Sequence, residues 1–108
     1  MSIERPTIAE EIKKEVDGYL DVMTKLVVDV EKGILAIGCE YHIDCYRDLI
    51  AHGSDPKNLW GANVYPDKKI DYIALVNIRP VRENRSMEVE SQEIKRKMES
   101  IIKRLLLL

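Results

Sequence analysis

The chain has 108 residues, of which 45% are hydrophobic and 33% are charged, and its net charge is −2. This composition is typical of one globular domain, which we place at residues 1–108, and it excludes a disordered chain. The weak negative charge argues against nucleic acid and against anionic membranes as electrostatic partners.

The first residues, "MSIERPTIAEEIKKE", are charged throughout, and no apolar run approaches the roughly 20 residues that span a bilayer. We therefore expect a cytoplasmic protein without a membrane partner. A single glutamine, no phenylalanine and abundant Glu, Lys and Arg favour a heat-adapted source. Two cysteines, Cys39 and Cys45, are too few for a disulfide framework or a multi-cysteine zinc site. We expect free thiols, although an internal disulfide would fit a heat-adapted protein.

Opposite charges accumulate at the two ends of the chain. Residues 1–24 hold six acidic and three basic side chains, whereas residues 79–108 hold eight basic and five acidic ones. We expect these ends to lie side by side, within one chain or across an oligomer.

The first expected element is an amphipathic helix over residues 8–22, capped by Thr7 with Glu10 as its capping-box partner. Period-two alternation then predicts a hairpin. A two-residue Lys32-Gly33 turn would pair Val28 with Ile37 and place the apolar side chains of both strands on one face.

We expect the second strand to continue to Ile43. A short helix follows, with Asp44 as its N-cap and Gly53 as its stop, and Asp55 caps the next turn. A second hairpin joins a strand in "WGANVYP", residues 60–66, to a strand over residues 70–80.

In this second hairpin Asn63 faces Asp71, and a last helix begins near Ser91. The order α-β-β-α-β-β-α predicts an α+β fold. We expect a four-stranded antiparallel sheet built from two hairpins, with the helices packed on one face.

Several motifs occur together in this chain: "VVDVEKGILAIG", Glu40-x-His42-x-Asp44, "GS" followed by "LWGANVYP", and "NIRP" followed by "NRS". As a set they resemble a small prokaryotic family, a domain of unknown function, over about Val22 to Leu105. The resemblance implies an α+β fold and carries over no catalytic residues.

The first candidate site is a metal or acid–base cluster of Glu40, His42 and Asp44. In an extended strand they share one face, but successive side chains lie about 7 Å apart, so a metal would need a bend. A divalent metal is the one cofactor that the sequence suggests. In the structural alternative Asp44 caps a helix and Glu40 pairs with a base. Cys45 near His42 would also form a nucleophile pair, for which no oxyanion donor can be assigned.

The second candidate site is an anion site in "NIRPVRENRS". Its donors suit phosphate or carboxylate groups; they are Asn77, Arg79, Arg82, Asn84, Arg85 and Ser86. In the structural alternative the arginines pair with acids. A regular hairpin would hold Asn63 about 20 Å from Asn77, which excludes Asn63 from this site. Trp60 is expected to anchor the core.

The chain ends with four consecutive leucines, which cover every side of one helical turn. Burying each is worth roughly 1.5–3 kcal/mol, so we expect them to enter a groove in this subunit or in a second one. The expected interface residues are Ile101, Leu105, Leu106, Leu107 and Leu108. A homo-oligomer follows, most simply a twofold dimer.

Two functions remain open. The first is a small-ligand-binding protein for an anion or a metal, or a hydrolytic enzyme, that uses the arginine-rich loop and the Glu/His/Asp cluster. The alternative is a non-catalytic oligomeric interaction module that uses the leucine-rich C-terminal helix.

Overall fold

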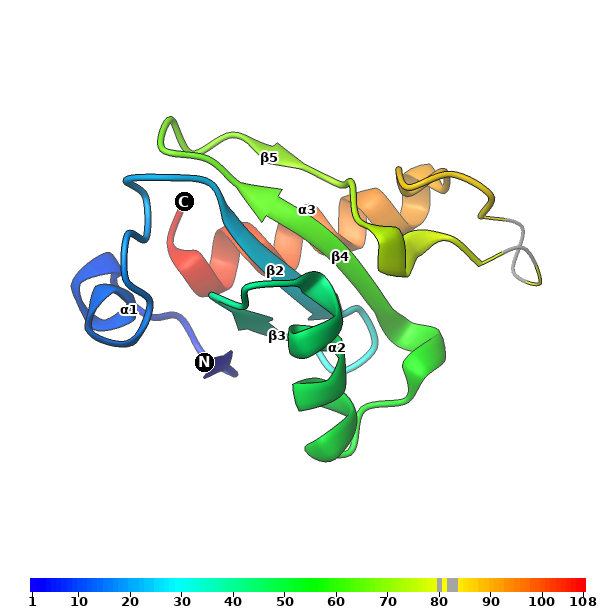
Figure 1. Cartoon of the computed structure of the whole chain (residues 1–108), viewed down its shortest axis with the longest axis horizontal. Coiled ribbons are helices and arrows are strands. Elements are labelled where there is room, and N and C mark those ends of the chain that lie inside the picture. The colour runs from blue at the N-terminus through cyan, green and yellow to red at the C-terminus, as the bar shows by residue number, and fades with distance from the viewer. Residues whose placement is uncertain (80, 82–83) are drawn as a thin grey trace.

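The computed structural model describes residues 1–79, 81 and 84–108 (Figure 1). Within these ranges the strands form an antiparallel sheet in the order β1-β3-β2-β4-β5. The strands are β1 (Ser2–Ile3), β2 (Thr24–Asp29), β3 (Ile34–Ile37), β4 (Leu59–Val64) and β5 (Ile70–Asp71). The α+β class and the two hairpins are confirmed, but the predicted four strands omitted β1, which pairs with β3 at the edge.

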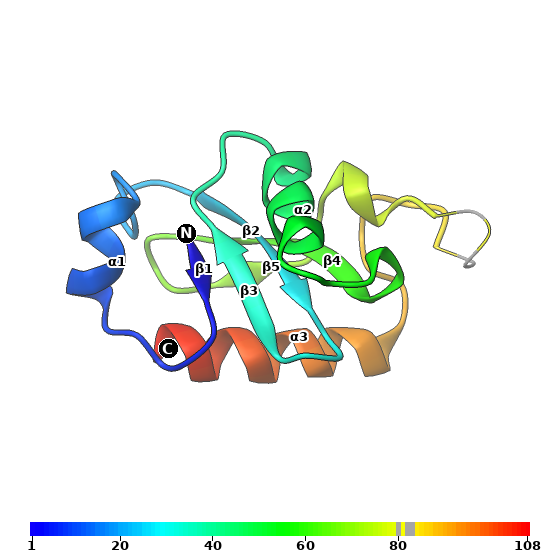
Figure 2. The same ribbon diagram turned by 90° about the horizontal axis from the view of Figure 1, so that it is seen from below.

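The helices cover both faces of the sheet, so the predicted packing on one face was wrong. They are α1 (Ala9–Glu15), α2 (His42–Ala51) and α3 (Gln92–Leu106), with 3₁₀ turns η1 (Pro56–Asn58) and η2 (Leu75–Asn77). Figure 2 shows α2 on one side of the sheet and α3 on the other. Alternation along β2 serves both layers: Leu26 and Val28 join the core beneath α3, whereas Val27 joins the smaller core beneath α2.

The first hairpin keeps the predicted faces but not the predicted register. Val28 pairs with Leu35, two residues away from its expected partner, because the turn contains four residues, 30–33. The buried carboxylate of Asp29 stabilises this longer turn, since its Oδ1 accepts hydrogen bonds from the backbone N–H groups of Glu31 and Lys32 at 2.9 and 2.8 Å. A shift of two residues preserves the side-chain alternation, which therefore cannot distinguish the two registers.

Helix α1 is shorter than predicted and lacks the expected cap. It ends at Glu15, and the chain then turns through Gly18 and Leu20, both with positive φ. The Thr7 hydroxyl donates to the carbonyl of Arg5 instead of capping the helix.

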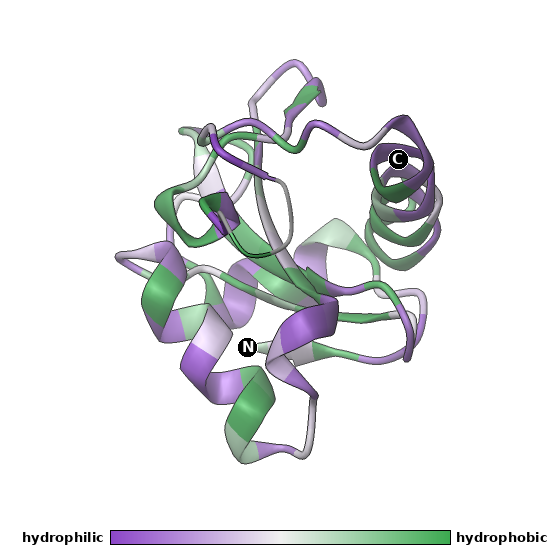
Figure 3. Cartoon of the chain, turned by 90° about the vertical axis from the view of Figure 1, so that its right-hand side faces the viewer, coloured by the Kyte–Doolittle hydropathy of each residue, from purple (hydrophilic) through white to green (hydrophobic). Residues whose placement is uncertain are grey.

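Helix α3 begins where it was predicted, with the Ser91 hydroxyl accepting from the Ile94 N–H. Its hydrophobic residues recur every three to four positions among hydrophilic ones, as in an amphipathic helix (Figure 3). The two chain ends meet within one chain, because the Thr7 N–H donates to the Leu105 carbonyl at 2.9 Å.

The leucine-rich end of α3 packs into the core of its own chain, which is the first of the two alternatives expected for it. Ile101, Leu105 and Leu106 are buried there, and Leu108 packs against them. Leu107, in the left-handed conformation after the helix, is the exposed member at 52%.

Strand β3 stops at Ile37, six residues before the predicted end. Gly38 turns the chain with a φ of +86°, and a Cβ there would lie 2.6 Å from a methyl carbon of Val16. Cys39 and Cys45 form a disulfide across this turn, so the expectation of free thiols was wrong. None of the helices in the described ranges is long and apolar enough to cross a membrane.

Candidate functional site

The three residues of the predicted metal or acid–base cluster do not share a strand face. Glu40 is exposed in the turn before α2, and His42 is the first residue of that helix. Asp44 is the third residue of the helix rather than its N-cap, and its Oδ2 accepts a hydrogen bond from the N–H of the N-cap residue Tyr41 at 3.3 Å. Among the residues that the structure describes, no three His, Cys, Asp or Glu side chains are grouped so that they could hold a metal ion.

The asparagines of the predicted anion site hold the backbone together. Asn77 is fully buried; its Oδ1 accepts from the Gly61 N–H at 2.7 Å, and its Nδ2 donates to the carbonyls of Gly61, Tyr72 and Met87. Asn84 donates to the Asn77 carbonyl at 2.7 Å and extends the same network. These amides are engaged with the chain itself.

Hydrogen bonds within the chain are also made by Arg79, Arg85 and Ser86. Arg79 donates to the carbonyls of Val76 and Leu59, and Arg82 lies outside the described residues. The backbone N–H groups of Arg85 and Ser86 both donate to the Glu90 carboxylate, at 2.5 and 3.1 Å. A carboxylate of the chain thus already occupies these two backbone donors.

The predicted strand over residues 70–80 ends at Asp71, and this early end creates a different site. As expected, Asn63 pairs with Asp71, with 2.7 Å between its Nδ2 and Oδ1 of the aspartate. Beyond Asp71 the chain crosses back over β4 and places Asn77 against Gly61. The 20 Å separation of Asn63 and Asn77 assumed a regular hairpin and does not apply.

Gly61 lets this returning segment and α2 approach the sheet closely. A Cβ at Gly61 would lie 2.5 Å from the Cβ of Ala74 and 3.3 Å from Cδ2 of His42. A cavity of about 410 Å³ opens here. We call it the His42 cleft, and its lining residues are Met23, Lys25, Tyr41, His42, Ile43, Asn63, Ile73, Ala74, Leu75, Val76 and Met87.

The lining of the His42 cleft is mainly apolar, and much of it faces water. Tyr41, Ile73, Leu75 and Met87 are all exposed, Leu75 by 70%. Lys25 is the charged side chain among the described lining residues. Exposed apolar side chains that gather around a cavity are typical of binding surfaces.

His42 is neutral at the wall of this cleft. Burial lowers its pKa from the usual value, while the Ala62 carbonyl and the Asn63 side chain oppose this shift. Its Nε2 lies 2.9 Å from the Ala62 carbonyl oxygen, which can only accept, so Nε2 carries the proton. The lone pair of neutral His42 is therefore on Nδ1.

Asn63 provides a second acceptor in this cleft. Its Nδ2 donates to the Asp71 carboxylate and to the Ile73 carbonyl, which fixes the orientation of the amide. Its Oδ1 is buried and has no hydrogen-bond partner in the described part of the chain. An orphaned buried acceptor of this kind costs about 1–3 kcal/mol.

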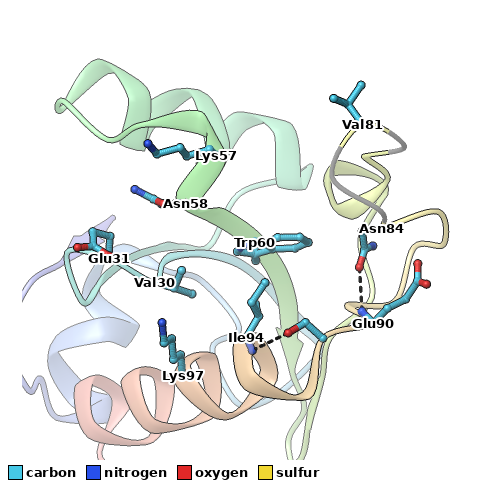
Figure 4. A pocket seen from close by; sticks show the side chains of 11 residues that line it. Val30, Glu31, Lys57, Asn58, Trp60, Val81, Asn84, Glu90, Ile94 and Lys97 are labelled. Atoms are coloured by element: carbon cyan, nitrogen blue, oxygen red, sulfur yellow. Dashed lines mark hydrogen bonds between the residues drawn. The ribbon is translucent and has the colours of Figure 1, made fainter.

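A larger cavity, of about 910 Å³, lies on the other side of the sheet beside Trp60 (Figure 4). Trp60 and Ile94 point into it, and Lys57 and Lys97 approach it from opposite sides. Glu31 and Glu90 also line it, so positive and negative side chains alternate around its rim. Among the residues that the structure describes, none that lines this cavity has a buried polar side-chain atom without a hydrogen-bond partner, which makes it the weaker candidate for a site.

Sequence reasoning found His42 but not its surroundings. The Gly61-x-Asn63 pattern on β4 puts a glycine and an amide on one face of the strand. A glycine within a strand was the available indication that another segment packs closely against it. Contact with α2 and η2 also required the order of the strands, which no local pattern encodes.

The fold and the cleft define a small α+β protein with a mainly apolar cleft beside a neutral histidine. The chain belongs to a family of proteins of unknown function, DUF5674, whose family model matches residues 1–105. The match begins well before Val22, where the resemblance of the motifs began. In comparisons with curated proteins and with solved structures, nothing matches this chain significantly.

Proposed function

We propose that this protein binds a small, mainly apolar molecule that carries a hydroxyl or N–H donor, and that the His42 cleft is the binding site. The observation that carries the proposal is the buried Oδ1 of Asn63, which lacks a partner among the described residues beside an apolar cavity. A ligand donor that reaches this oxygen recovers the hydrogen bond that the folded chain leaves unmade.

The polar groups of the cleft select the kind of ligand. Nδ1 of neutral His42 and Oδ1 of Asn63 both accept hydrogen bonds, so together they favour a donor over an anion. The apolar side chains around them provide most of the contact area. Because the asparagines and backbone donors of the arginine-rich loop are engaged, an anion there would have to displace bonds within the chain.

Matched aromatic probes test this proposal. Phenol and anisole have similar apolar bodies, but only phenol donates a hydrogen bond. Titration of the ¹⁵N-labelled chain with phenol should shift the backbone amides of His42, Asn63 and Ala74 in a saturable way. Anisole should bind about three- to tenfold more weakly, which corresponds to one hydrogen bond of roughly 1 kcal/mol.

The two histidines provide a matched pair of variants. His42→Gln keeps an N–H donor for the Ala62 carbonyl but removes the ring, and it should weaken phenol binding. His52→Gln alters an exposed residue at the other end of α2 and should leave binding unchanged. Equal binding of phenol and anisole, or phenol shifts confined to the surroundings of Trp60, would contradict the proposal.

A further inference from the structure

The two cysteines of the Cys39–Cys45 disulfide differ in burial. Cys45 is fully buried against Val27, Ala36, Leu49 and Leu59 beneath α2. Its partner is half-buried in the turn that precedes the helix. An incoming thiolate must reach the sulfur that it attacks, so this asymmetry selects Cys39.

A separate cavity leads to this accessible cysteine. It has a volume of about 330 Å³, and its lining includes Cys39, Gly38 and the polar side chains of Glu15, Asp17 and Lys25. Because Gly38 has no side chain, Val16 packs closely against the turn that carries Cys39. The cavity thus holds charges of both signs, with Lys25 against Glu15 and Asp17, which suits a small polar thiol that itself carries both an ammonium group and carboxylates.

We infer that this disulfide is an exchange site for a small polar thiol of the glutathione class, with Cys39 as the attacked residue. The thiolate forms a bond to Sγ of Cys39 while the Cys39–Cys45 bond breaks. The electron pair leaves on Sγ of Cys45, which takes a proton from solvent. The product is a mixed disulfide at Cys39 and a buried thiol at Cys45.

The mixed disulfide has two fates, and both balance. The Cys45 thiol can lose its proton to solvent and attack Sγ of Cys39, which expels the small thiol as a thiolate and restores the original bond. A second thiolate can instead attack the sulfur of the bound thiol, giving the small disulfide and a Cys39 thiolate. The second route reduces the protein by two electrons and oxidises two molecules of the small thiol.

The exchange does not require the chain to unfold, because other contacts hold both ends of the turn. The Gly38 N–H donates to the Lys25 carbonyl at 3.0 Å, and the Tyr41 N–H donates to Asp44. Nε2 of His42 donates to the Ala62 carbonyl. Helix α2 therefore remains docked when the sulfur–sulfur bond is open. This inference is independent of the ligand proposed for the His42 cleft.

Peptide mapping of the native chain tests the inference directly. The full-length oxidised protein is incubated with reduced glutathione, quenched in acid and alkylated. Cleavage after Glu40 then separates the two cysteines for mass spectrometry. The glutathione adduct should be at least tenfold more abundant at Cys39 than at Cys45, and the ratio should approach one when the same reaction is run in denaturant.

Two variants distinguish the reaction of Cys39 with the small thiol from the re-formation of the disulfide by Cys45. With oxidised glutathione, Cys45→Ser should accumulate a stable adduct at Cys39, because the resolving thiol is gone. Cys39→Ser leaves the buried Cys45 alone and should react at least tenfold more slowly. Equal adducts on the two cysteines of the native chain, exchange only at the rate of global unfolding, or two free thiols in the air-exposed protein would overturn the inference.

Discussion

The guanidinium carbon of Arg79 lies 4.3 Å from the centroid of the Trp60 ring, stacked on an indole that is only 4% exposed. Arg79 also donates to the carbonyls of Val76 and Leu59. One side chain thus joins the chain after η2 to the start of β4. These contacts support a structural role for Arg79.

Replacement of Arg79 should therefore lower stability. We expect Arg79→Ala to reduce the free energy of unfolding by about 2 kcal/mol, because it removes a cation–π contact and leaves carbonyl acceptors without their donor. Arg79→Lys should recover only part of this loss, since an ammonium lacks the planar fork. Urea denaturation measures both variants. Arg85→Ala, at an exposed position, is the control and should change stability by less than about 0.5 kcal/mol.

The close approach at Gly61 gives a second prediction. Gly61→Ala should cost about 1–3 kcal/mol, because the new methyl group would lie 2.5 Å from the Cβ of Ala74. Ala74→Gly in the same chain removes that contact, so the double variant should recover part of the loss. A double-mutant cycle by thermal denaturation measures the coupling. Additive effects of the two changes would contradict the placement of this segment over β4.

Much of the architecture followed from local patterns. The hairpins, the start of α3 near Ser91 and the Asn63–Asp71 pair were all predicted, because alternation, helical periodicity and turns act over a few residues. The prediction of a strand over residues 70–80 was wrong, because local patterns do not record the contacts that end this strand at Asp71. Its alternation continues past Asp71, but the Asn77 amide makes hydrogen bonds to backbone groups of Gly61 and Met87, which are 16 and 10 residues away.

The candidate site shows the same division between local and long-range information. His42 was selected because β3 was expected to continue to Ile43. Instead β3 ends at Ile37, and His42 is the first residue of α2. Its hydrogen bond to Ala62 spans 20 residues and depends on β4 lying beside β2. The sequence contained the histidine and the amide of Asn63, but the order of the strands brings them together.

The buried leucines of α3 allow a direct comparison of neighbouring positions. Leu105→Ala should cost about 2–5 kcal/mol, because Leu105 is fully buried in the main core. Leu107→Ala should cost less than about 0.5 kcal/mol, since that side chain is half in solvent. Denaturant midpoints test the pair, and sedimentation shows the mass. Unfolding that depends on protein concentration, with a large effect of Leu107→Ala, would instead indicate an interface.

The shifted pKa of His42 predicts a pH dependence of stability. Its folded-state pKa lies below the usual 6.5, so the unfolded chain binds more protons between these two values. The contribution of His42 is therefore fully present above pH 6.5 and is lost as the pH falls toward the folded-state pKa. Urea midpoints of the wild type should decline over this window.

His42→Gln removes the titrating group and should flatten that part of the pH profile, whereas His52→Gln should leave the profile as it is in the wild type. NMR titration of the two imidazoles supplies the pKa of each ring independently. A His42 resonance that titrates above pH 6.5 would contradict the burial argument.

Reduction of the disulfide should weaken the fold without abolishing it. The bond closes a short loop between Cys39 and Cys45, for which chain entropy predicts about 2 kcal/mol of stabilisation. The reduced chain keeps the two packed cores and the hydrogen bonds of the turn, so its far-UV circular dichroism should match that of the oxidised chain. Urea unfolding with and without a reductant measures the difference.

The Cys39→Ser, Cys45→Ser double variant should unfold at the midpoint of the reduced chain in either condition, because it has no bond to lose. If that variant instead responded to the reductant, the stabilisation would come from somewhere other than this disulfide.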